Sequence, residues 1–398
     1  MKKLLILGGA RAQIPAIIKS KELGYYTITC DYLPNNPGHA YSDKYENIST
    51  VDKDKILEFA QKEEIDGIIA YASDPSAPSA AYVCDKMNLP GASFKATQIL
   101  CEKDLFRQFQ KENGFLTPWF FKIEKIEDIE KYKETIKFPC VVKPVDCSGS
   151  KGVKVVDKFE ELNASVQDAL NFSRCKRVII EQYIKTSCCQ LHGDGIVVNG
   201  KLEFLELGDQ RFRNAVPIGS SFPSQIDSHI VEKATEEVAR LIELSKFECG
   251  GINVEVRVSD ANEIYIIEIG PRTGGNYIPQ IMELATGVDE MTISLQLAMG
   301  EYCEKKISKK REYCFQYIVG SDADGIFQEL YIDDYMKKKV IKQYIHKTPG
   351  DIVENYKNSN GVVGVILLKF SNMQEMEQDI VSIKEHIRVI VKEDAREK

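Results

Sequence analysis

Two carboxylates and an arginine interrupt apolar stretches in the second half of the chain. Glu268 lies in the middle of YIIEIGPRTGGN, among Ile and Tyr residues, and Arg272 follows it at the start of a glycine-rich turn. Glu255 lies in NVEVRV, where Arg257 shares its face because side chains in a strand alternate with a period of two. A Glu–Arg pair on the surface would explain Glu255 and Arg257, but it explains Glu268 poorly. This spacing is typical of a working site at the end of a strand.

A divalent cation would account for both carboxylates. If their strands pair as a hairpin, Glu255 and Glu268 stand side by side, and strict alternation places Glu268 on the face of Ile266, away from Ile267 and Ile269. Adjacent carboxylates repel each other in a low dielectric, and Mg²⁺ prefers such oxygen ligands together with substrate phosphates. The chain has five His without a zinc-like spacing, so a zinc site has no support.

A lysine and a glycine-rich turn form a second candidate cluster, in PCVVKPVDCSGSKGV (139–153). A Walker loop needs its lysine at the start of a helix, whereas Lys143 precedes the glycines and a strand, VKVV, follows them. We therefore predict a strand–loop–strand hairpin. Free N–H groups in such a turn can approach phosphate oxygens, and a lysine in an apolar strand is costly to bury unless it meets an anion.

The first ninety residues must provide a frame for these groups. Strands are predicted at 3–9, 25–30 and 66–72, each followed by a helical pattern, as expected for parallel βαβ units that bind ligands at the carboxyl ends of the strands. Three features would meet at that edge: the run from Gly8 to Arg11, Asp31, and Ser73-Asp74-Pro75. Because the glycines do not form GxGxxG, a dinucleotide site is only weakly indicated, and a tight turn explains them equally well.

The remaining chain changes to an antiparallel pattern. An Asn-Gly turn at 199–200 joins two strands and is a strong hairpin signal, and a helix at 229–246 precedes the strands 251–259 and 263–270. A basic link at 301–312 leads to a smaller α+β unit with a strand at 361–370 and a final amphipathic helix.

Composition excludes several classes of protein. The net charge is −8 with no dense basic block, which argues against nucleic acid as a partner, and no apolar stretch approaches the roughly 20 residues that span a membrane. The eleven Cys are scattered, odd in number and without CxxC, as in a cytoplasmic protein with reduced thiols. We interpret the pair Cys188-Cys189 as two small residues on opposite faces of a strand.

Five motifs in this order resemble the ATP-grasp superfamily over most of the chain. CEKDLFRQF followed by NGFLTP resembles the first nucleotide-binding lysine, and VVKP with SGSKGV resembles the second lysine and the glycine-rich lid. IIEQYI resembles the hinge strand that holds adenine, and NVEVRV with IIEIGPR resembles the Mg²⁺ strands. GVVGVILLKF is similar to the small C-terminal domain of the biotin carboxylase and glycinamide-synthetase branches.

The resemblance implies a role for each matched residue, with ATP and Mg²⁺ as cofactors. Mg²⁺ would lie on Glu255 and Glu268, and Arg272 would stabilise charge on an acylphosphate, with Lys143 as the other catalytic residue. A salt-bridged surface is the alternative for Arg211 and Arg213. The implied nucleotide-binding residues are Lys103, Lys143, Ser148, Gly149, Ser150, Lys151, Gly152, Glu181, Gln182, Ile184, Gln190 and His192; the implied substrate residues are Arg211, Arg213, Arg257, Gly274, Gly275 and Asn276.

Two positions depart from the family pattern. The family reads Glu-x-Asn-Pro-Arg at the end of the second metal strand, with the Asn oxygen on a second Mg²⁺, whereas this chain has Gly270. The hinge is normally followed by Gly-x-Glu, and here Gln190 and His192 share a face instead. A histidine satisfied within the core is the alternative for His192.

The resemblance also implies an overall organisation and an activity. We expect an α/β and α+β multidomain protein: a Rossmann-like pre-ATP-grasp domain (1–95), an ATP-grasp domain (96–305) with a lid subdomain at about 115–183, and a C-terminal α+β domain (306–398). The implied activity is that of a cytoplasmic carboxylate–amine ligase that forms an amide through an acylphosphate, on small metabolites such as an amino acid. Alternatives are a phosphoribosylglycinamide-synthetase-type or biotin-carboxylase-like enzyme, or a non-catalytic ATP-binding regulator. The family also implies a homodimer.

Overall fold

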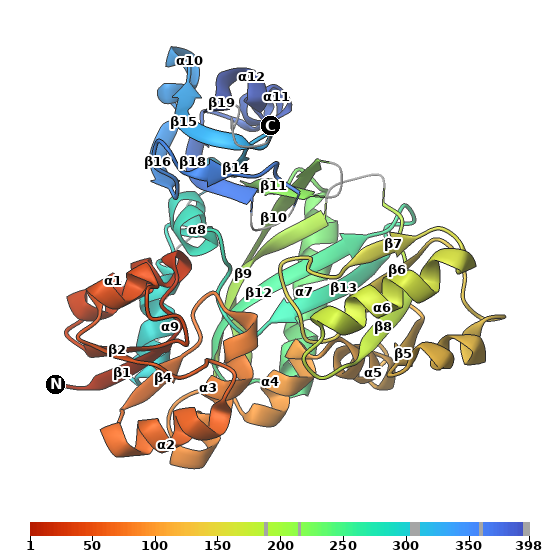
Figure 1. The fold of residues 1–398 in the computed structure, drawn as a ribbon, viewed down its shortest axis with the longest axis horizontal. Helices are drawn as coiled ribbons and strands as arrows, with labels where there is room; N and C mark the ends of the chain where they lie inside the picture. Colours follow the sequence, from red (N-terminus) through yellow and green to blue (C-terminus); the bar gives the residue numbers. More distant parts are fainter. Residues whose placement is uncertain (187–189, 214–215, 303–310, 358–360, 393–398) are drawn as a thin grey trace, which may run out of the picture.

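A computed structural model describes residues 1–398 except 187–189, 214–215, 303–310, 358–360 and 393–398 (Figure 1). The interpretation of Cys188-Cys189, and most of the predicted basic link at 301–312, therefore lie outside the described residues. No helix in the described part is long and apolar enough to cross a membrane.

The N-terminal unit is a parallel sheet between two layers of helices, as its alternating pattern predicts. The strand order is β3-β2-β1-β4, and β1 pairs in parallel with both β2 and β4. Helices α2 and α3 cover one face. The other face is covered by α1 and by α9, a helix from much later in the chain (Figure 1). The elements are β1 (Lys3–Leu7), α1 (Ile14–Glu22), β2 (Tyr26–Cys30), β3 (Lys44–Glu46), α2 (Lys53–Glu63), β4 (Gly67–Ile69) and α3 (Ala77–Met87).

A four-stranded antiparallel sheet with its own core forms the next unit, at the right of Figure 1. The strand order is β5-β8-β6-β7, and α6 packs on it. The pairing of β6 with β7 confirms the hairpin predicted around the glycine-rich turn. Two helices lead into the unit. The elements are α4 (Phe94–Cys101), α5 (Lys103–Glu112), β5 (Phe120–Ile123), β6 (Cys140–Pro144), β7 (Lys154–Val156), α6 (Leu162–Phe172) and β8 (Val178–Gln182).

An eight-stranded sheet, in the order β13-β12-β9-β10-β11-β14-β18-β16, forms the centre of the molecule. Helix α7 packs on one face and α8 on the other. Asn199 and Gly200 have φ values of 51° and 76°, so the predicted Asn-Gly turn does join β9 to β10. The elements up to the C-terminal part are β9 (Gln190–Val198), β10 (Lys201–Arg213), β11 (Val216–Phe222), α7 (Ser228–Ser245), β12 (Gly250–Val258), β13 (Ile264–Gly270), α8 (Ile278–Thr286) and α9 (Glu290–Ala298).

The last ninety residues contribute three strands to this large sheet and also form a small sheet, β17-β15-β19. The predicted strand and amphipathic helix are present as β18 and α11, but the chain then continues through α12 into a last strand, β19, so α11 is not the final element. The elements are β14 (Tyr313–Gly320), β15 (Gly325–Ile332), α10 (Asp334–Lys337), β16 (Val340–Ile345), β17 (Ile352–Val353), β18 (Val362–Phe370), α11 (Met373–Val381), α12 (Ile383–His386) and β19 (Ile387–Lys392).

Candidate functional site

The two predicted carboxylates face each other across the hairpin of β12 and β13. Glu255 is the direct cross-strand partner of Glu268. Burial and the neighbouring charge of Glu268 raise the pKa of Glu255 to about 7. Oε2 of Glu255 accepts a hydrogen bond of 3.0 Å from Nε2 of Gln190. Two repelling carboxylates with this donor set suit a hard cation such as Mg²⁺, which would complete its ligands with water and phosphate oxygens.

A β-bulge at Ile267 orients Glu268. The register slips so that Glu255 pairs with Glu268 while Val256 pairs with Ile266, which leaves Ile267 without a partner. Ile266 therefore packs in the same core cluster as Ile269. The expectation that Glu268 shares a face with Ile266 is wrong, because the extra residue resets the alternation between them.

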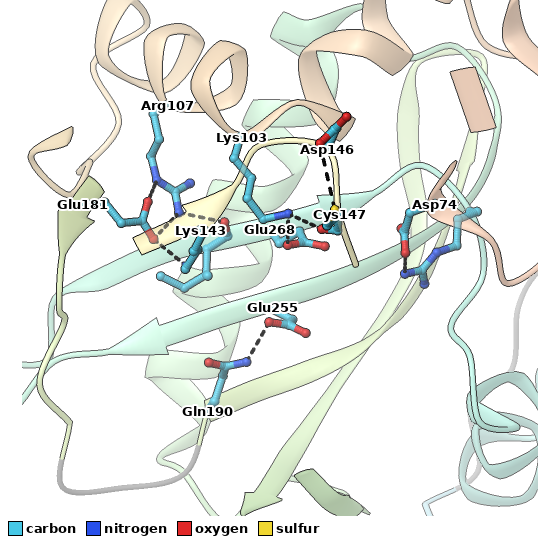
Figure 2. Close-up of polar contacts among 12 residues, drawn as sticks. Asp74, Lys103, Arg107, Lys143, Asp146, Cys147, Glu181, Gln190, Glu255 and Glu268 are labelled. Carbon is cyan, nitrogen blue, oxygen red and sulfur yellow. Dashed lines mark hydrogen bonds and ion pairs between the residues drawn. The ribbon is translucent and has the colours of Figure 1, made fainter. Parts of the chain in front are cut away.

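The two predicted lysines pair with carboxylates on two different sheets (Figure 2). Nζ of Lys103, at the start of α5, lies 3.2 Å from Oε2 of Glu268 and donates to the carbonyl of Cys147 at 2.9 Å. Nζ of Lys143, on β6, lies 2.5 Å from Oε1 of Glu181 on β8. The structure thus brings Lys103 to the predicted metal strand and Lys143 to the predicted hinge.

A buried arginine that the sequence did not single out completes this network. Arg107, only 1% exposed, donates through Nε to Glu181 at 2.9 Å and through Nη2 to the bulge carbonyl of Ile267 at 2.9 Å. Burial alone would raise the pKa of Glu181, but Arg107 and Lys143 outweigh it and hold that pKa at about 2. The Glu181 carboxylate, predicted to hold adenine, is therefore engaged by two cations in this structure.

The glycine-rich loop lies between β6 and β7, at the edge of the candidate site. Gly149, Ser150 and Gly152 have φ values of 67°, 58° and 69°, so the turn uses left-handed backbone at three positions. Gly149, Ser150 and Lys151 are exposed and Ser148 is half-buried. Backbone N–H groups of such a loop are available to an anion.

The hinge segment connects to the metal strands through side chains. Gln182 exchanges backbone and side-chain hydrogen bonds with Trp119, and Ile184 accepts at its carbonyl from Nη1 of Arg257 at 3.0 Å. Nε of Arg257 also donates to Gln190, whose amide reaches Glu255. Arg257, predicted as a substrate residue, therefore lies beside the hinge.

His192 is buried on β9, in the row of side chains next to Gln190. Its Nδ1 lies 2.8 Å from Oγ of Ser220, and its Nε2 lies 3.1 Å from the amide of Asn253. Burial, reinforced by the charge of Arg272, lowers the pKa of His192 to about 4, so the ring is neutral near pH 7. These contacts match the alternative of a core histidine, and its predicted role toward nucleotide stays a prediction.

The glycine-rich turn after β13 is anchored by hydrogen bonds at Gly274 and Asn276 and has free space at Gly275. Asp194, a buried residue on β9, accepts from the backbone N–H of Gly274 at 2.7 Å, and the carbonyl of Asn276 accepts from Gln316 at 2.8 Å. Apart from Gly275 and its two chain neighbours, no heavy atom of the described residues lies within 4 Å of the position that a Cβ would take at Gly275. The turn therefore leaves room for a ligand at Gly275.

Arg211 and Arg213 point to other partners. Nη2 of Arg211 lies 3.2 Å from Asp209 and also pairs with Glu377 on α11, while Arg213 lies 3.7 Å from Asp322. These ion pairs correspond to the salt-bridged alternative, and the substrate roles of both residues stay predictions.

Arg272 meets a carboxylate from the N-terminal unit. Its Nη2 lies 2.6 Å from Oδ2 of Asp74, which follows β4 and is labelled in Figure 2. Its Nη1 donates to the carbonyl of Thr273 at 2.9 Å. Asp74 was noted in the sequence only as a residue at the end of a strand. The pair joins two units that the sequence separates by nearly two hundred residues.

Comparisons with known proteins match this geometry. Residues 136–280 match the ATP-grasp domain family. The chain contains an ATP-grasp domain over these residues. The predicted family and fold class are thereby confirmed, and the match covers β6 and β7, the hinge and the metal strands.

Solved structures with the same fold align with nearly the whole chain. An L-amino acid ligase from Bacillus licheniformis has a TM-score of 0.82 at 21% identity and covers 98% of this chain and 99% of its own. A phosphoribosylglycinamide synthetase from Anaerococcus prevotii has a TM-score of 0.77 at 23% identity, with coverage of 98% and 100%. The biotin carboxylase domain of the Hydrogenobacter thermophilus 2-oxoglutarate carboxylase, a dimer solved with MgADP and bicarbonate, has a TM-score of 0.76 at 16% identity, with coverage of 98% and 91%.

The alignments with curated relatives cover only part of each relative's length. The uncharacterized protein y4rH from Sinorhizobium fredii is 26% identical over 257 residues, or 63% of this chain. The carbamoyl phosphate synthase large chain of Thermotoga petrophila is 26% identical over 304 residues, or 74% of this chain. The chain matches 52% of the first and 27% of the second.

Proposed function

We propose that this ATP-grasp protein is an ATP-dependent ligase that joins a small carboxylate, such as an amino acid, to an amine. The observation that carries the proposal is the convergence of Lys103, Glu268 and Glu255 at one point, where the like-charged pair needs a cation. In the reaction, a carboxylate oxygen of the substrate bonds to the γ-phosphorus of ATP as the bond to ADP breaks. The amine then displaces phosphate from the acylphosphate to give an amide.

The residues of the chain would mostly position and neutralise, since phosphoryl transfer needs little covalent assistance. Glu255 and Glu268 would hold Mg²⁺, which supplies charge neutralisation at the phosphates when bound. Lys103, Lys143 and the loop at 148–152 would orient ATP, with adenine at the backbone of Gln182 and Ile184. Arg272 would stabilise the negative charge that develops on the acylphosphate.

A screen for ADP release tests this proposal. Purified protein with Mg-ATP is incubated with a panel of carboxylates and amines, and ADP is measured with and without each pair. We expect ADP release that requires both substrates. Nucleotide binding without ADP release in any combination would contradict the proposal and favour a non-catalytic ATP-binding regulator.

A cationic pocket favours a second candidate, an enzyme of the phosphoribosylglycinamide-synthetase type that takes a phosphorylated amine. An open pocket of about 730 Å³ is lined by Arg11, His346 and Lys347 from the N- and C-terminal units, together with Asp351. The guanidinium of Arg11 has no ion pair or hydrogen bond to any described residue, whereas its backbone carbonyl accepts from Ile14. Burial and the charges of Arg11 and Lys347 lower the pKa of His346 to about 4, so it does not contribute a positive charge near pH 7.

Arg11→Gln separates the two candidates. If the pocket binds a substrate phosphate, we expect the variant to raise the KM for phosphoribosylamine by at least about tenfold, the effect of losing one charged hydrogen bond. The KM for ATP should not change. An unchanged KM for phosphoribosylamine, or no turnover of it by the unaltered protein, would support unphosphorylated substrates instead. The same assay with added bicarbonate tests for carboxylating activity.

A further inference from the structure

The glycine at the end of β13 is required by space and not by backbone conformation. Gly270 does not lie in the left-handed region of φ, where glycine is favoured. A Cβ added there would lie 2.8 Å from Oδ1 of Asp74 and 3.2 Å from Cζ of Arg272. The Asp74 carboxylate therefore occupies the volume into which any side chain at 270 would project.

The two carboxylate oxygens of Asp74 make different contacts. Oδ1 lies against Gly270, while Oδ2 accepts from Nη2 of Arg272 at 2.6 Å. Both side chains are mostly buried, with 21% of the Asp74 side chain and 10% of the Arg272 side chain exposed. Nε of Arg272 is buried without a hydrogen-bond partner among the described residues. The guanidinium is thus held through its two terminal nitrogens, one of which donates to Asp74 and the other to the carbonyl of the next residue, Thr273.

The local backbone presents Asp74 at this point. Ala72, two residues before Asp74, has a φ of 52°, a left-handed conformation that costs a non-glycine residue about 1–2 kcal/mol. The hydroxyls of Ser73 and Ser76 lie 2.6 Å apart across the short 3₁₀ helix that follows. Strain of this kind is retained where surrounding contacts fix the geometry, and it is frequent at functional sites.

We propose that Asp74 is a positioning residue for Arg272, holding its guanidinium at the end of β13 in the space that Gly270 leaves free. Position 270 and Asp74 are therefore coupled: a side chain at 270 displaces the carboxylate and with it the guanidinium. The catalytic consequence rests on the proposed function, because it assumes that Arg272 acts on the acylphosphate. The geometric part does not, and the test reads the two separately.

Chemical labelling reads the position of Arg272 without any substrate. Folded protein is treated with phenylglyoxal, which modifies accessible guanidinium groups, and labelling of Arg272 is followed by peptide mass spectrometry. We expect Asp74→Asn to label Arg272 at least about fivefold faster than the unaltered protein. Gly270→Ala should accelerate the labelling of Arg272 to a similar extent. The double variant Gly270→Ala with Asp74→Ala should label Arg272 at a rate within twofold of that of Asp74→Ala alone.

Glu301→Gln provides a matched control. Glu301 makes another ion pair to the N-terminal unit, 2.6 Å from Nζ of Lys2, and accepts from the hydroxyl of Tyr25 at 2.6 Å. Losing it should lower the unfolding temperature slightly and leave Arg272 labelling unchanged. Equal labelling of Arg272 in Asp74→Asn and in the unaltered protein, or a Gly270→Ala effect of the same size in both backgrounds, would overturn the proposal.

Kinetics complete the test once a substrate pair is known. We expect Asp74→Asn to lower kcat by about 10- to 100-fold with the KM for ATP unchanged, whereas Glu301→Gln retains full kcat. A structural salt bridge alone would shift the unfolding temperature and leave kcat within twofold. If the unaltered protein releases no ADP, the proposed function fails, while the labelling result still decides whether Asp74 holds Arg272.

Discussion

Replacing Glu268 with glutamine should lower ADP formation by at least about 100-fold, the scale of removing one charge that stabilises a transition state. The carboxylate is one of the two expected Mg²⁺ ligands, and it also lies 3.2 Å from Nζ of Lys103. Nucleotide binding should persist, because the hinge at 181–184 is untouched. The measurement is the initial rate of ADP release at saturating Mg-ATP, with nucleotide affinity measured separately by titration.

Stability distinguishes this loss from unfolding. Glu268 is the charge that, with burial, raises the pKa of Glu255. Glutamine removes that repulsion but also the ion pair to Lys103, and because the two effects oppose each other we expect Glu268→Gln to unfold close to the temperature of the unaltered protein in the absence of metal. Glu263→Gln, at an exposed position just before the same strand, is the control and should retain full turnover. Unchanged turnover in Glu268→Gln would show that the metal strand is assigned incorrectly.

Replacing Arg107 with methionine should lower the free energy of unfolding by about 3–5 kcal/mol, the cost of breaking a buried ion pair. Arg107 is 1% exposed and binds Glu181, which is 2% exposed, so the variant leaves a buried carboxylate with Lys143 as its remaining cation. The carbonyl of Ile267 also loses its donor. The effect should be large because the charge that remains cannot reach water.

Trp119, the only tryptophan of the chain, provides a local probe for this experiment. Its carbonyl accepts from the backbone of Gln182, next to Glu181. Urea unfolding followed by its fluorescence therefore reports on the unit that Arg107 stabilises. Arg240→Met is the control: Arg240 is 40% exposed, pairs with Glu237, donates to the carbonyl of Asn113 and lies over the ring of Phe115. We expect a loss of about 1–2 kcal/mol, because its removal leaves no buried charge. A comparable small loss in Arg107→Met would show that the buried network contributes little.

The parts of the site that follow from local periodicity were predictable from the sequence. The hairpin of β12 with β13 follows from the two strand patterns, and the position of Lys143 before the glycines excludes a Walker loop. The register that sets Glu255 opposite Glu268 depends on the bulge at Ile267. The bulge at Ile267 was not predictable, because no residue in that strand marks it. Its carbonyl accepts from Arg107, a residue of another element that the strand's own sequence does not reveal.

Residues whose partners lie far along the chain were missed for the same reason. Arg107 sits in an amphipathic helix, α5, and in the sequence it looks like one more charged residue on a polar face. Its partner Glu181 is 74 residues away. Gly270 looked like a missing ligand, and only the contact with Asp74 shows that another carboxylate fills its place. A polar residue at a strand end, such as Asp74, was the one local signal available.

The strand order also determines which parts of the molecule can move as separate bodies. β14, β18 and β16 extend the same hydrogen-bonded sheet that carries Glu255 and Glu268, so the C-terminal unit is mechanically continuous with the metal strands. The sheet β5-β8-β6-β7 shares no strand with it among the described residues. Lys143 and the glycine-rich loop therefore belong to a sheet that can rotate relative to the large sheet without loss of strand pairing. Glu255, Glu268 and the pocket residue His346, which directly follows β16, are instead held by one continuous sheet.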